Sequence, residues 1–470
     1  MATTFRRLAL ILLLSGLLAG IAFAQEGEAP AAAKPTFGLG LGIGVQTFNE
    51  PSGSVTYQSL SLSPDLAFGK FGIGLAVTLN YRFTGAANSF EVRLADWWPQ
   101  APDPVTFQTV AAIYLPKISY VRWGEKGDPL FVKLGSINDS TLGNGFIVGN
   151  YANTLFLPSN RLFGLNFDMD GSLFGFPYVG LETMTGNLAE LDVIGGRLYV
   201  RPLAGTKIPI LKNLEFGGTV AADREPDLYY STTTAAAPVL AFGGDVRLPV
   251  IFIKNVFSLV TFGDVASTPK GASDRAWGGM VGLGGKFFSF LTYGAQLRML
   301  GDDFIPVYFD ATYDLLRNVQ YDLVQATGFS DASMGWMASL GTSFFDDKFV
   351  FKVSLDAPFV APVTDPADLS AIVKNPHLRG TFTIGEGIIP GLPGISLDAS
   401  YDKKGITDFT STPPGGLFNP TNAAIQAKLN YKSGPAVLSF VYKVRYEPPA
   451  TPDDTPWVVT SGLESSIQLF

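Results

Sequence analysis

The feature that most constrains the fold is an unbroken alternation of side-chain type between Phe71 and Phe83. Odd positions carry large apolar residues, and even positions carry Gly, Ala, Thr, Asn or Arg. Successive side chains of a β-strand point to opposite faces, so this period of two predicts a strand with one apolar face and one small or polar face. A soluble sheet and a membrane barrel both accept such a strand, so the rest of the chain must decide between them.

The same alternation recurs along most of the chain. In residues 37–45 the even positions are all glycine, which follows the period of a strand and not the GxGxxG spacing of a phosphate-binding turn. Other runs place charged residues on one face and apolar residues on the other; they lie at 214–223, 240–248, 291–299, 349–356, 395–402 and 438–446. The chain is therefore predicted to be all-β.

Composition favours a membrane over water. Mean hydropathy is +0.23, and only 16% of residues are charged. Beyond residue 24, however, no run of about 18 apolar residues could form a spanning helix. In hydrocarbon every backbone polar group needs an internal partner, which only helices and closed barrels provide. The sequence thus predicts a transmembrane antiparallel up-and-down β-barrel, in which the 52 glycines and 13% aromatic residues serve the lumen, the turns and the interfacial girdles.

The N-terminal residues predict export. Residues 1–24 have the form of a signal peptide, with Arg6 and Arg7, an apolar run and the cleavage pattern Ala22-Phe-Ala24. A membrane anchor is the alternative, for which the apolar run is short. An Ala/Pro-rich periplasmic tether, residues 25–35, precedes a barrel predicted to span residues 36–470. The chain has no cysteine, which excludes a lipoprotein, disulfides and thiol chemistry.

The links between runs predict how the barrel is oriented. Short links at Gly69-Lys70, Asp346-Asp347 and Ser433-Gly434 alternate with long polar links at 223–238, 360–376 and 403–421. Such an alternation is typical of short periplasmic turns and longer extracellular loops. Tracing the runs gives about 22 strands, within an even range of about 18–22, and the segment 316–327 is the least regular of them.

With the signal peptide, the missing spanning helices and the repeated hairpins together, residues 36–470 resemble bacterial outer-membrane porin-like barrels. The terminal Phe470 is common in such barrels, although it is out of step with Leu463, Ile467 and Leu469. The resemblance implies an integral protein of a Gram-negative outer membrane, surrounded by lipid and lipopolysaccharide. It implies a passive, water-filled route for small solutes, no cofactor, and a homotrimer as one assembly to test. A net charge of −8 argues against a nucleic-acid partner.

The polar faces of the runs nominate pore-lining residues. The main candidates are Arg82, Lys133, Arg197, Arg247, Arg298, Asp310, Lys352, Arg379, Asp398, Lys428, Lys443 and Arg445; further acidic candidates are Asp223, Asp245, Asp314, Asp356 and Asp402. Charges of both signs predict pairing between neighbouring strands and leave the choice between anion and cation preference open.

Residues 142–159 form the most unusual link. The segment is too apolar for a freely solvated loop, and its glycines permit tight folding. One interpretation is a constriction loop folded into the lumen, with Gly143, Gly145, Phe146 and Tyr151 as its candidate residues. The other is a segment that packs on the rim or forms a further strand.

Catalysis and metal binding find little support. His377 is the single histidine, so neither a histidine-based metal cluster nor a conventional acid–base site is expected. Residues 166–171 copy the opening of a calcium loop, but the twelfth position is Pro177 where a bidentate Glu is required. No enzyme, metal or cofactor is therefore predicted.

Three functions remain open. The leading hypothesis is a porin-like channel for passive diffusion of small hydrophilic solutes. The first alternative is a hydrophobic-substrate transporter that resembles the fatty-acid barrels, for which residues 25–35 are short as a plug. The second is a structural or adhesive surface barrel. An open polar lumen favours diffusion, a plugged apolar lumen favours hydrophobic transport, and a filled lumen favours a structural role.

Overall fold

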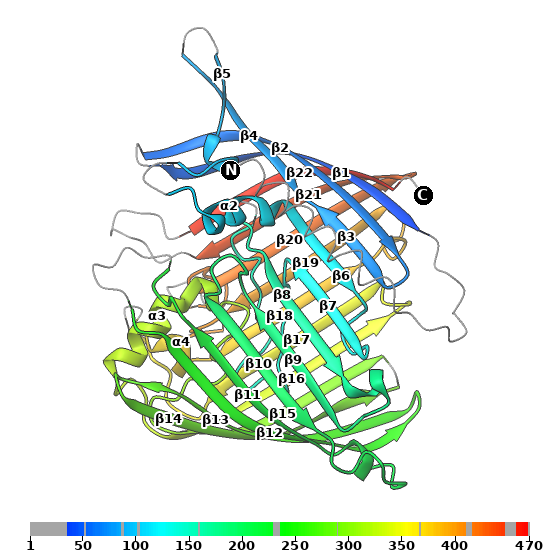
Figure 1. Cartoon of the computed structure of the whole chain (residues 1–470), viewed down its shortest axis with the longest axis vertical. Helices are drawn as coiled ribbons and strands as arrows, with labels where there is room; N and C mark the ends of the chain where they lie inside the picture. Colours follow the sequence, from blue (N-terminus) through cyan, green and yellow to red (C-terminus); the bar gives the residue numbers. More distant parts are fainter. Residues whose placement is uncertain are drawn as a thin grey trace, which may run out of the picture.

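The structure is a computed structural model that describes residues 35–50, 53–85, 89–100, 104–157, 160–228, 236–288, 290–365, 368–409, 416–446 and 457–468. The predicted signal peptide, the tether up to residue 34 and the terminal Phe470 lie outside these ranges. Consecutive strands pair antiparallel, and β1 (Thr36–Glu50) also pairs with β22 (Trp457–Gln468), which closes the sheet. The predicted antiparallel β-barrel is confirmed (Figure 1).

The remaining strands are β2 (Gly53–Phe68), β3 (Phe71–Leu75), β4 (Val77–Thr84), β5 (Ser89–Val92), β6 (Ile118–Trp123), β7 (Leu130–Gly135), β8 (Gly164–Asp170), β9 (Val179–Thr185), β10 (Val193–Val200), β11 (Glu215–Asp223), β12 (Val239–Ile253), β13 (Phe257–Lys270), β14 (Asp274–Phe287), β15 (Leu291–Leu300), β16 (Ser333–Phe344), β17 (Phe349–Pro358), β18 (His377–Ile384), β19 (Ile395–Lys403), β20 (Ala423–Ser433) and β21 (Ala436–Tyr446). The α-helices are α2 (Phe107–Tyr114), α3 (Tyr313–Ala326) and α4 (Ala371–Lys374); the 3-10 helices are η1 (Leu94–Asp96), η2 (Leu115–Lys117), η3 (Gly171–Phe174) and η4 (Leu211–Asn213).

Twenty strands form the closed wall, within the predicted even range. β3 and β4 follow one another along a single strand of the barrel wall, interrupted at Ala76. β5 lies outside the wall and pairs only with the end of β4. The prediction of a single strand over Phe71–Phe83 is therefore wrong in one respect. β3 pairs with β6, the register shifts between Gly74 and Leu75, and β4 then pairs with β5 instead.

The short and long links named above lie at opposite ends, as predicted, although length alone does not define an end: the link 271–273 shares the end of the long links, and the link 201–214 shares the other. Antiparallel strands alternate ends, so the short turns at 69–70, 345–348 and 434–435 share one end of the barrel. The long links at 224–238, 359–376 and 404–422 share the opposite end. These are called the short-turn end and the long-loop end below.

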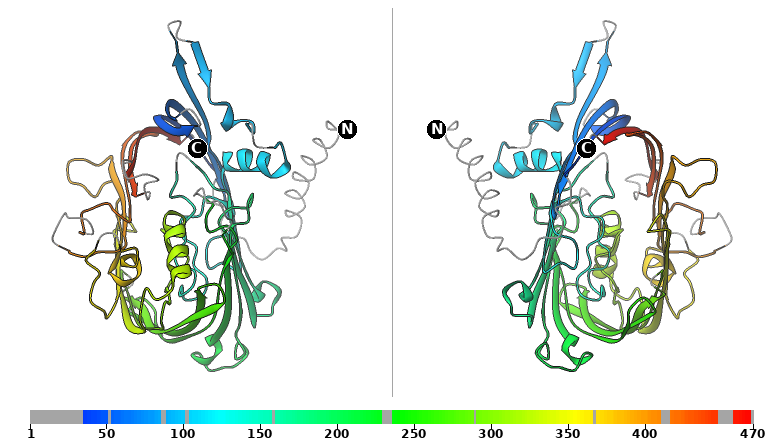
Figure 2. Two further views of the ribbon diagram at one scale, coloured as in Figure 1. Left: turned by 90° about the vertical axis from the view of Figure 1, so that its left-hand side faces the viewer. Right: turned by 90° about the vertical axis from the view of Figure 1, so that its right-hand side faces the viewer.

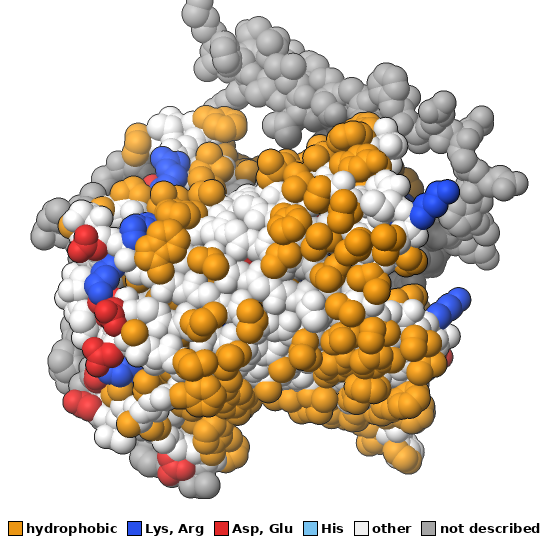
Figure 3. Space-filling model, turned by 90° about the horizontal axis from the view of Figure 1, so that it is seen from below, with side chains coloured by type: hydrophobic (Ala, Val, Ile, Leu, Met, Phe, Trp, Pro, Cys, Tyr) orange, Lys and Arg blue, Asp and Glu red, His pale blue; other side chains and the backbone are white. Residues whose placement is uncertain are grey.

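The side chains that point outward from the wall strands are mostly apolar and exposed. Ile43, Leu60, Trp277, Ile253 and Leu463 are examples from different parts of the wall. In Figure 3 hydrophobic side chains cover the middle of the visible face, and charged side chains gather toward its two margins. Within the described ranges, none of the helices has the length and apolar character needed to cross a bilayer. A closed barrel with this exterior is the architecture of an integral outer-membrane protein.

The segment 316–327, traced from the sequence as an irregular strand, is helical. It belongs to α3, whose buried residues include Tyr313, Leu316, Gln320 and Leu323. These positions recur every three or four residues, which is the period of one helix face and not of a strand. Figure 2 looks along the barrel and shows α3 inside the ring of strands.

Candidate functional site: the barrel lumen

Two inter-strand segments fill part of the lumen near the long-loop end. The first is the inward loop, residues 136–157, which follows β7; the second is the α3 segment, residues 301–332, which follows β15. Their backbones bond to each other, because Val307 donates to the carbonyl of Phe146 at 2.9 Å and Phe309 donates to that of Ile147 at 3.0 Å. They thus form one unit inside the wall (Figure 2).

A hydrophobic cluster holds this unit together, and it is called the lumen core below. The tilted rings of Phe146 and Phe304 have centroids 5.5 Å apart, and those of Phe309 and Tyr313 have centroids 4.7 Å apart. The wall meets these rings with small buried residues on adjacent strands, namely Ala221, Ala241, Ala266 and Ala276. A Cβ at Gly278 would lie 2.4 Å from the Phe304 ring. Small residues on the wall therefore let the core approach closely.

A buried ion-pair cluster joins α3 to the wall. Arg317 donates to Asp223 at 2.6 Å through Nη2 and to Asp192 at 3.0 Å through Nη1. Tyr313 donates its hydroxyl to Asp223 at 2.6 Å. Removing one partner of a buried ion pair leaves an uncompensated charge in the interior, which is strongly destabilising. This cluster therefore fixes the position of α3 against the wall.

Asp314 adds a third carboxylate to the same buried region. Tyr151 of the inward loop donates its hydroxyl toward both carboxylate oxygens of Asp314, at 3.1 Å each. Burial raises the pKa of Asp314 from 3.8 to about 7; Arg317 opposes this shift, and the Asp192 carboxylate adds to it. One guanidinium thus faces three carboxylates, and a proton on Asp314 relieves part of the excess negative charge.

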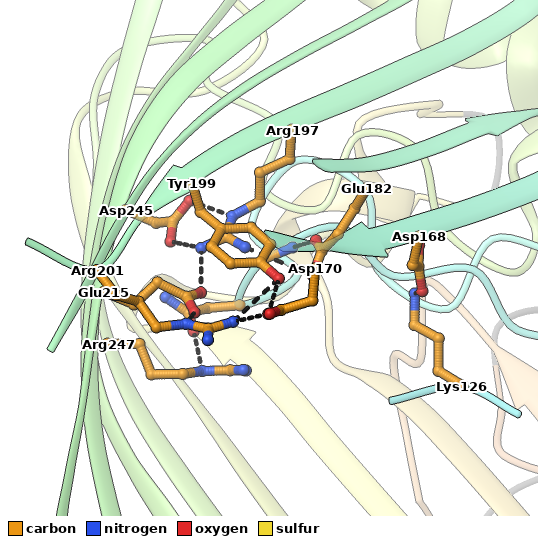
Figure 4. Close-up of polar contacts among 12 residues, drawn as sticks. Lys126, Asp168, Asp170, Glu182, Arg197, Tyr199, Arg201, Glu215, Asp245 and Arg247 are labelled. Carbon is orange, nitrogen blue, oxygen red and sulfur yellow. Dashed lines mark hydrogen bonds and ion pairs between the residues drawn. The ribbon is translucent and has the colours of Figure 1, made fainter. Parts of the chain in front are cut away.

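A charge network on β8–β13 holds the tip of the inward loop (Figure 4). Arg197 on β10 is fully buried and donates to Asp245 on β12 at 2.6 Å and to Glu215 on β11 at 2.7 Å. Gly143 of the loop donates its backbone N–H to Glu182 at 2.9 Å. With a φ of +58°, Gly143 adopts a left-handed conformation, and a Cβ there would lie 2.8 Å from the Arg197 Nε. Glycine is therefore the residue that fits this contact.

Asn144 is the second anchor of the loop tip. Its amide donates to Asp264 at 3.0 Å and accepts from Arg247 at 3.1 Å. Toward the short-turn end the network continues through Arg201, which pairs with Asp170 and lies 3.1 Å from Glu215. The charges on this side of the lumen are thus largely engaged with each other or with the loop.

The opposite side of the lumen is a polar cleft. Two cavities with volumes of about 210 and 310 Å³ lie between the lumen core and the inner faces of β15–β21. They adjoin, because Ala311, Arg379 and Asp402 line both. The second cavity also reaches Thr381, one inward position closer to the short-turn end.

Strand register explains why charges line this cleft. Arg379 lies beside Asp402 on the next strand, and the row continues through Ala424 to Arg445. The adjacent row, nearer the short-turn end, holds Lys352 and Lys443. The inward set predicted from period two therefore forms continuous rows across β17–β21.

Other predicted pore-lining residues lie in the first cavity or closer to the short-turn end. Arg298 pairs with Asp356 at 2.9 Å in the first cavity, where Lys404 lies 2.5 Å from Asp310. Closer to the short-turn end, Lys428 pairs with Glu464 at 2.9 Å, and Asp398 lies opposite it on β19.

Lys133 and Arg82 lie away from the two cavities. Lys133 is on β7, opposite Arg122 and Asn166 in the register. Arg82 pairs with Glu91 of β5 at 2.9 Å, on the branch outside the wall.

His377 lies at the start of β18 between two carboxylates. Its Nε2 is 2.7 Å from Asp402 and its Nδ1 is 3.4 Å from Asp356. The carboxylates of the segment that resembles the start of a calcium loop form ion pairs instead: Asp168 pairs with Lys126, and Asp170 pairs with Arg201. Among the described residues, no cluster of three or more His, Cys, Asp or Glu side chains is arranged to hold a metal ion.

Sequence reasoning offered an inward loop with Phe146 and Tyr151 as one of two interpretations, but it missed α3, the packing of α3 against that loop, and its anchor to the wall. The helical spacing of Tyr313, Leu316 and Gln320 is a signal that could have revealed α3. The pairing of Arg317 with Asp192 and Asp223 has no sequence signal, because these residues lie about a hundred positions apart. Only the closed fold brings them together.

No protein-family model matches the sequence, and no curated protein sequence matches it. Several solved structures align with most of the chain at low sequence identity. OprD of Pseudomonas aeruginosa has a TM-score of 0.33 and 10% identity, covering 95% of this chain and 98% of that one. OccAB4 of Acinetobacter baumannii has a TM-score of 0.32 and 10% identity, with coverages of 93% and 99%. OpdK of Pseudomonas aeruginosa, solved with vanillate, has a TM-score of 0.32 and 9% identity, with coverages of 93% and 98%.

Proposed function

We propose that the protein is a porin-like channel of the outer membrane through which small hydrophilic solutes diffuse passively. The observation that carries this proposal is the polar cleft between the lumen core and β15–β21. Its walls bear charged side chains of both signs, including Arg298, Arg379 and Asp402. Charged linings favour hydrated solutes over apolar ones.

The lumen core is proposed to act as the constriction. The inward loop carries Gly143, Gly145, Phe146 and Tyr151, and Phe146 and Tyr151 are buried against α3 and the wall. Because this unit occupies the β9–β15 side, solutes are confined to the cleft on the other side. Hydrogen bonds to Glu182 and Asp264 hold the loop tip in place.

The alternatives receive less support. A hydrophobic-substrate transporter would need an apolar site left open for its ligand, whereas Phe146, Phe304 and Phe309 pack on each other. A purely structural or adhesive barrel would need no polar cavities in its lumen, and two adjoining ones are present. The proposal involves no chemical reaction and no cofactor.

A matched pair of tryptophan substitutions tests the proposal. Thr381 faces the second cavity beside Lys352 and Ser400, whereas Phe382 is the next residue and faces outward with Phe351. In planar bilayers, Thr381→Trp should reduce single-channel conductance by about two-fold or more, because it fills part of the cleft. Phe382→Trp should conduct like the wild type. Absence of conductance in the wild type, or equal conductance in the two variants, would contradict the proposal.

A further inference from the structure

A two-stranded arm leaves the barrel wall where β4 changes partner. β4 pairs with β2 over Val77–Tyr81 and with β5 over Tyr81–Thr84. Figure 2 shows this hairpin projecting beyond the ring of strands. The arm, defined as residues 81–84 and 89–92, therefore has surroundings that differ from those of the wall.

The arm has an aromatic face and a polar face. Tyr81, Phe83 and Phe90 form one cluster, with ring centroids 5.4 to 6.0 Å apart. Phe83 and Phe90 are more than half exposed, at 55% and 57%. On the other face Arg82 pairs with Glu91 at 2.9 Å. Nothing in the described part of the chain covers the two phenylalanine rings.

Strand register indicates that this aromatic cluster lies beyond the lipid-facing belt of the barrel, so lipid does not bury it. Leu60 of β2 faces outward opposite Leu79, and the next outward row pairs Gln58 with Tyr81. Gln58 and the following outward residue, Thr56, are exposed and polar. The apolar belt of β2 thus ends where the arm departs. Contiguous exposed aromatic side chains outside the belt indicate a protein interface.

The backbone of β5 points to a strand as the partner. β5 pairs with β4 on one edge, and no described strand pairs with its other edge. A free edge is a template for another strand, and an isolated two-stranded hairpin is only marginally stable in water. A strand added to this edge would satisfy the backbone and extend the aromatic face.

We propose that a second copy of this chain supplies that strand, through antiparallel pairing of the two β5 edges about a two-fold axis at Phe90. Directly opposed residues of an antiparallel pair point to the same face. Centring on Phe90 therefore joins the two aromatic clusters and sets Ser89 opposite Glu91 of the partner subunit. Centring on Glu91 would instead oppose two carboxylates. A two-fold contact uses the same surface on both subunits, and it differs from the homotrimer that the porin resemblance implies.

The absence of cysteine makes the test direct. Phe90→Cys should form a disulfide-linked dimer as its main product under mild oxidation in lipid nanodiscs. Opposed antiparallel residues have Cα atoms about 4.5–5.5 Å apart, within disulfide reach. The control is Phe174→Cys on η3, which is 72% exposed and lies at the short-turn end. It should stay monomeric.

A second variant separates loss of docking from loss of folding. Phe83→Ser/Phe90→Ser should abolish the dimer in native mass spectrometry and leave single-channel conductance unchanged, because the arm lies outside the lumen. Two results would overturn the proposal. One is a Phe90→Cys variant that crosslinks no more than Phe174→Cys; the other is a fluorophore at position 90 that is quenched by lipid-borne quenchers.

Discussion

The protonation of Asp314 should control how firmly α3 is held in the lumen. α3 is part of an inter-strand segment and not a wall strand. Burial raises the pKa of Asp314 to about 7 from 3.8, so the closed lumen binds a proton that the opened segment releases. Stability is therefore lost as pH rises above 3.8, and the loss levels off above pH 7. Asp314→Asn keeps an acceptor for Tyr151 and removes the titration.

The magnitude follows from this displacement of the pKa. Each pH unit between the two pKa values changes the free energy of α3 opening by about 1.4 kcal/mol, which gives about 4 kcal/mol over the full window. Between pH 5 and pH 8 the expected change is about 2–3 kcal/mol, or roughly 100-fold in the opening equilibrium. The charged groups around Asp314 are Asp192, Asp223 and Arg317.

Hydrogen–deuterium exchange of α3 amides, corrected for the intrinsic pH dependence of exchange, measures this opening. Wild-type protection should fall from pH 5 to pH 8, whereas protection in Asp314→Asn should change little. Tyr151→Phe removes a hydrogen bond that lowers the pKa of Asp314, so it should move the wild-type profile to higher pH. Asp331→Asn, an exposed position on the same segment, serves as the control. Identical profiles for the wild type and Asp314→Asn would refute the reasoning.

Two further predictions concern the wall and the lumen core. Leu75→Lys should impair membrane assembly, because a lysine that faces lipid costs about 2–4 kcal/mol. Thr78→Lys should be tolerated, because Thr78 faces inward and its side chain forms a hydrogen bond with Ser61. Equal folding yields in the two variants, measured by heat-modifiable gel mobility, would contradict the assignment of faces. Deleting residues 143–157 removes the loop half of the lumen core and should raise single-channel conductance in planar bilayers; unchanged conductance would show that the core does not narrow the path.

The barrel could be predicted because lipid imposes one rule on every strand. Outward side chains within the apolar belt must be apolar, so the period of two appears in Ile395–Lys403 as clearly as in Leu291–Leu300. The contrast between short turns such as 434–435 and long links such as 359–376 likewise indicates the two ends. The break at Ala76 was not predictable, because the alternation of faces continues while the strand on one side changes from β6 to β5. The period of two shows to which face of the sheet each side chain points, but it does not show with which strand the segment pairs.

The lining was predicted as a set of faces, and its contacts were not. Arg379 and Asp402 lie on adjacent strands, which pairing of consecutive runs suggests. Arg197 and Asp245 lie two strands apart and meet because both are buried under the loop tip at Gly143. The packing of the inward loop against α3 and the wall escaped prediction for a related reason. An alanine such as Ala241 suits both a wet lining and a packed core, and a distant segment decides which one it meets.

The small residues behind the lumen core bear on how the barrel finds its strand register. At the long-loop end of β12 both faces are apolar, with Val239 and Ala241 inward and Leu240 outward. A slip of one residue exchanges the two faces of a strand, so a slip of β12 would turn Asp245 and Arg247 toward lipid, whereas its long-loop end adds no such penalty. The slip would turn Leu240 toward Phe146 and its neighbours, where the wall now offers only methyl groups. At the long-loop end of β12 the lumen core therefore adds a steric reason for the native register, where the apolar pattern of the strand provides none.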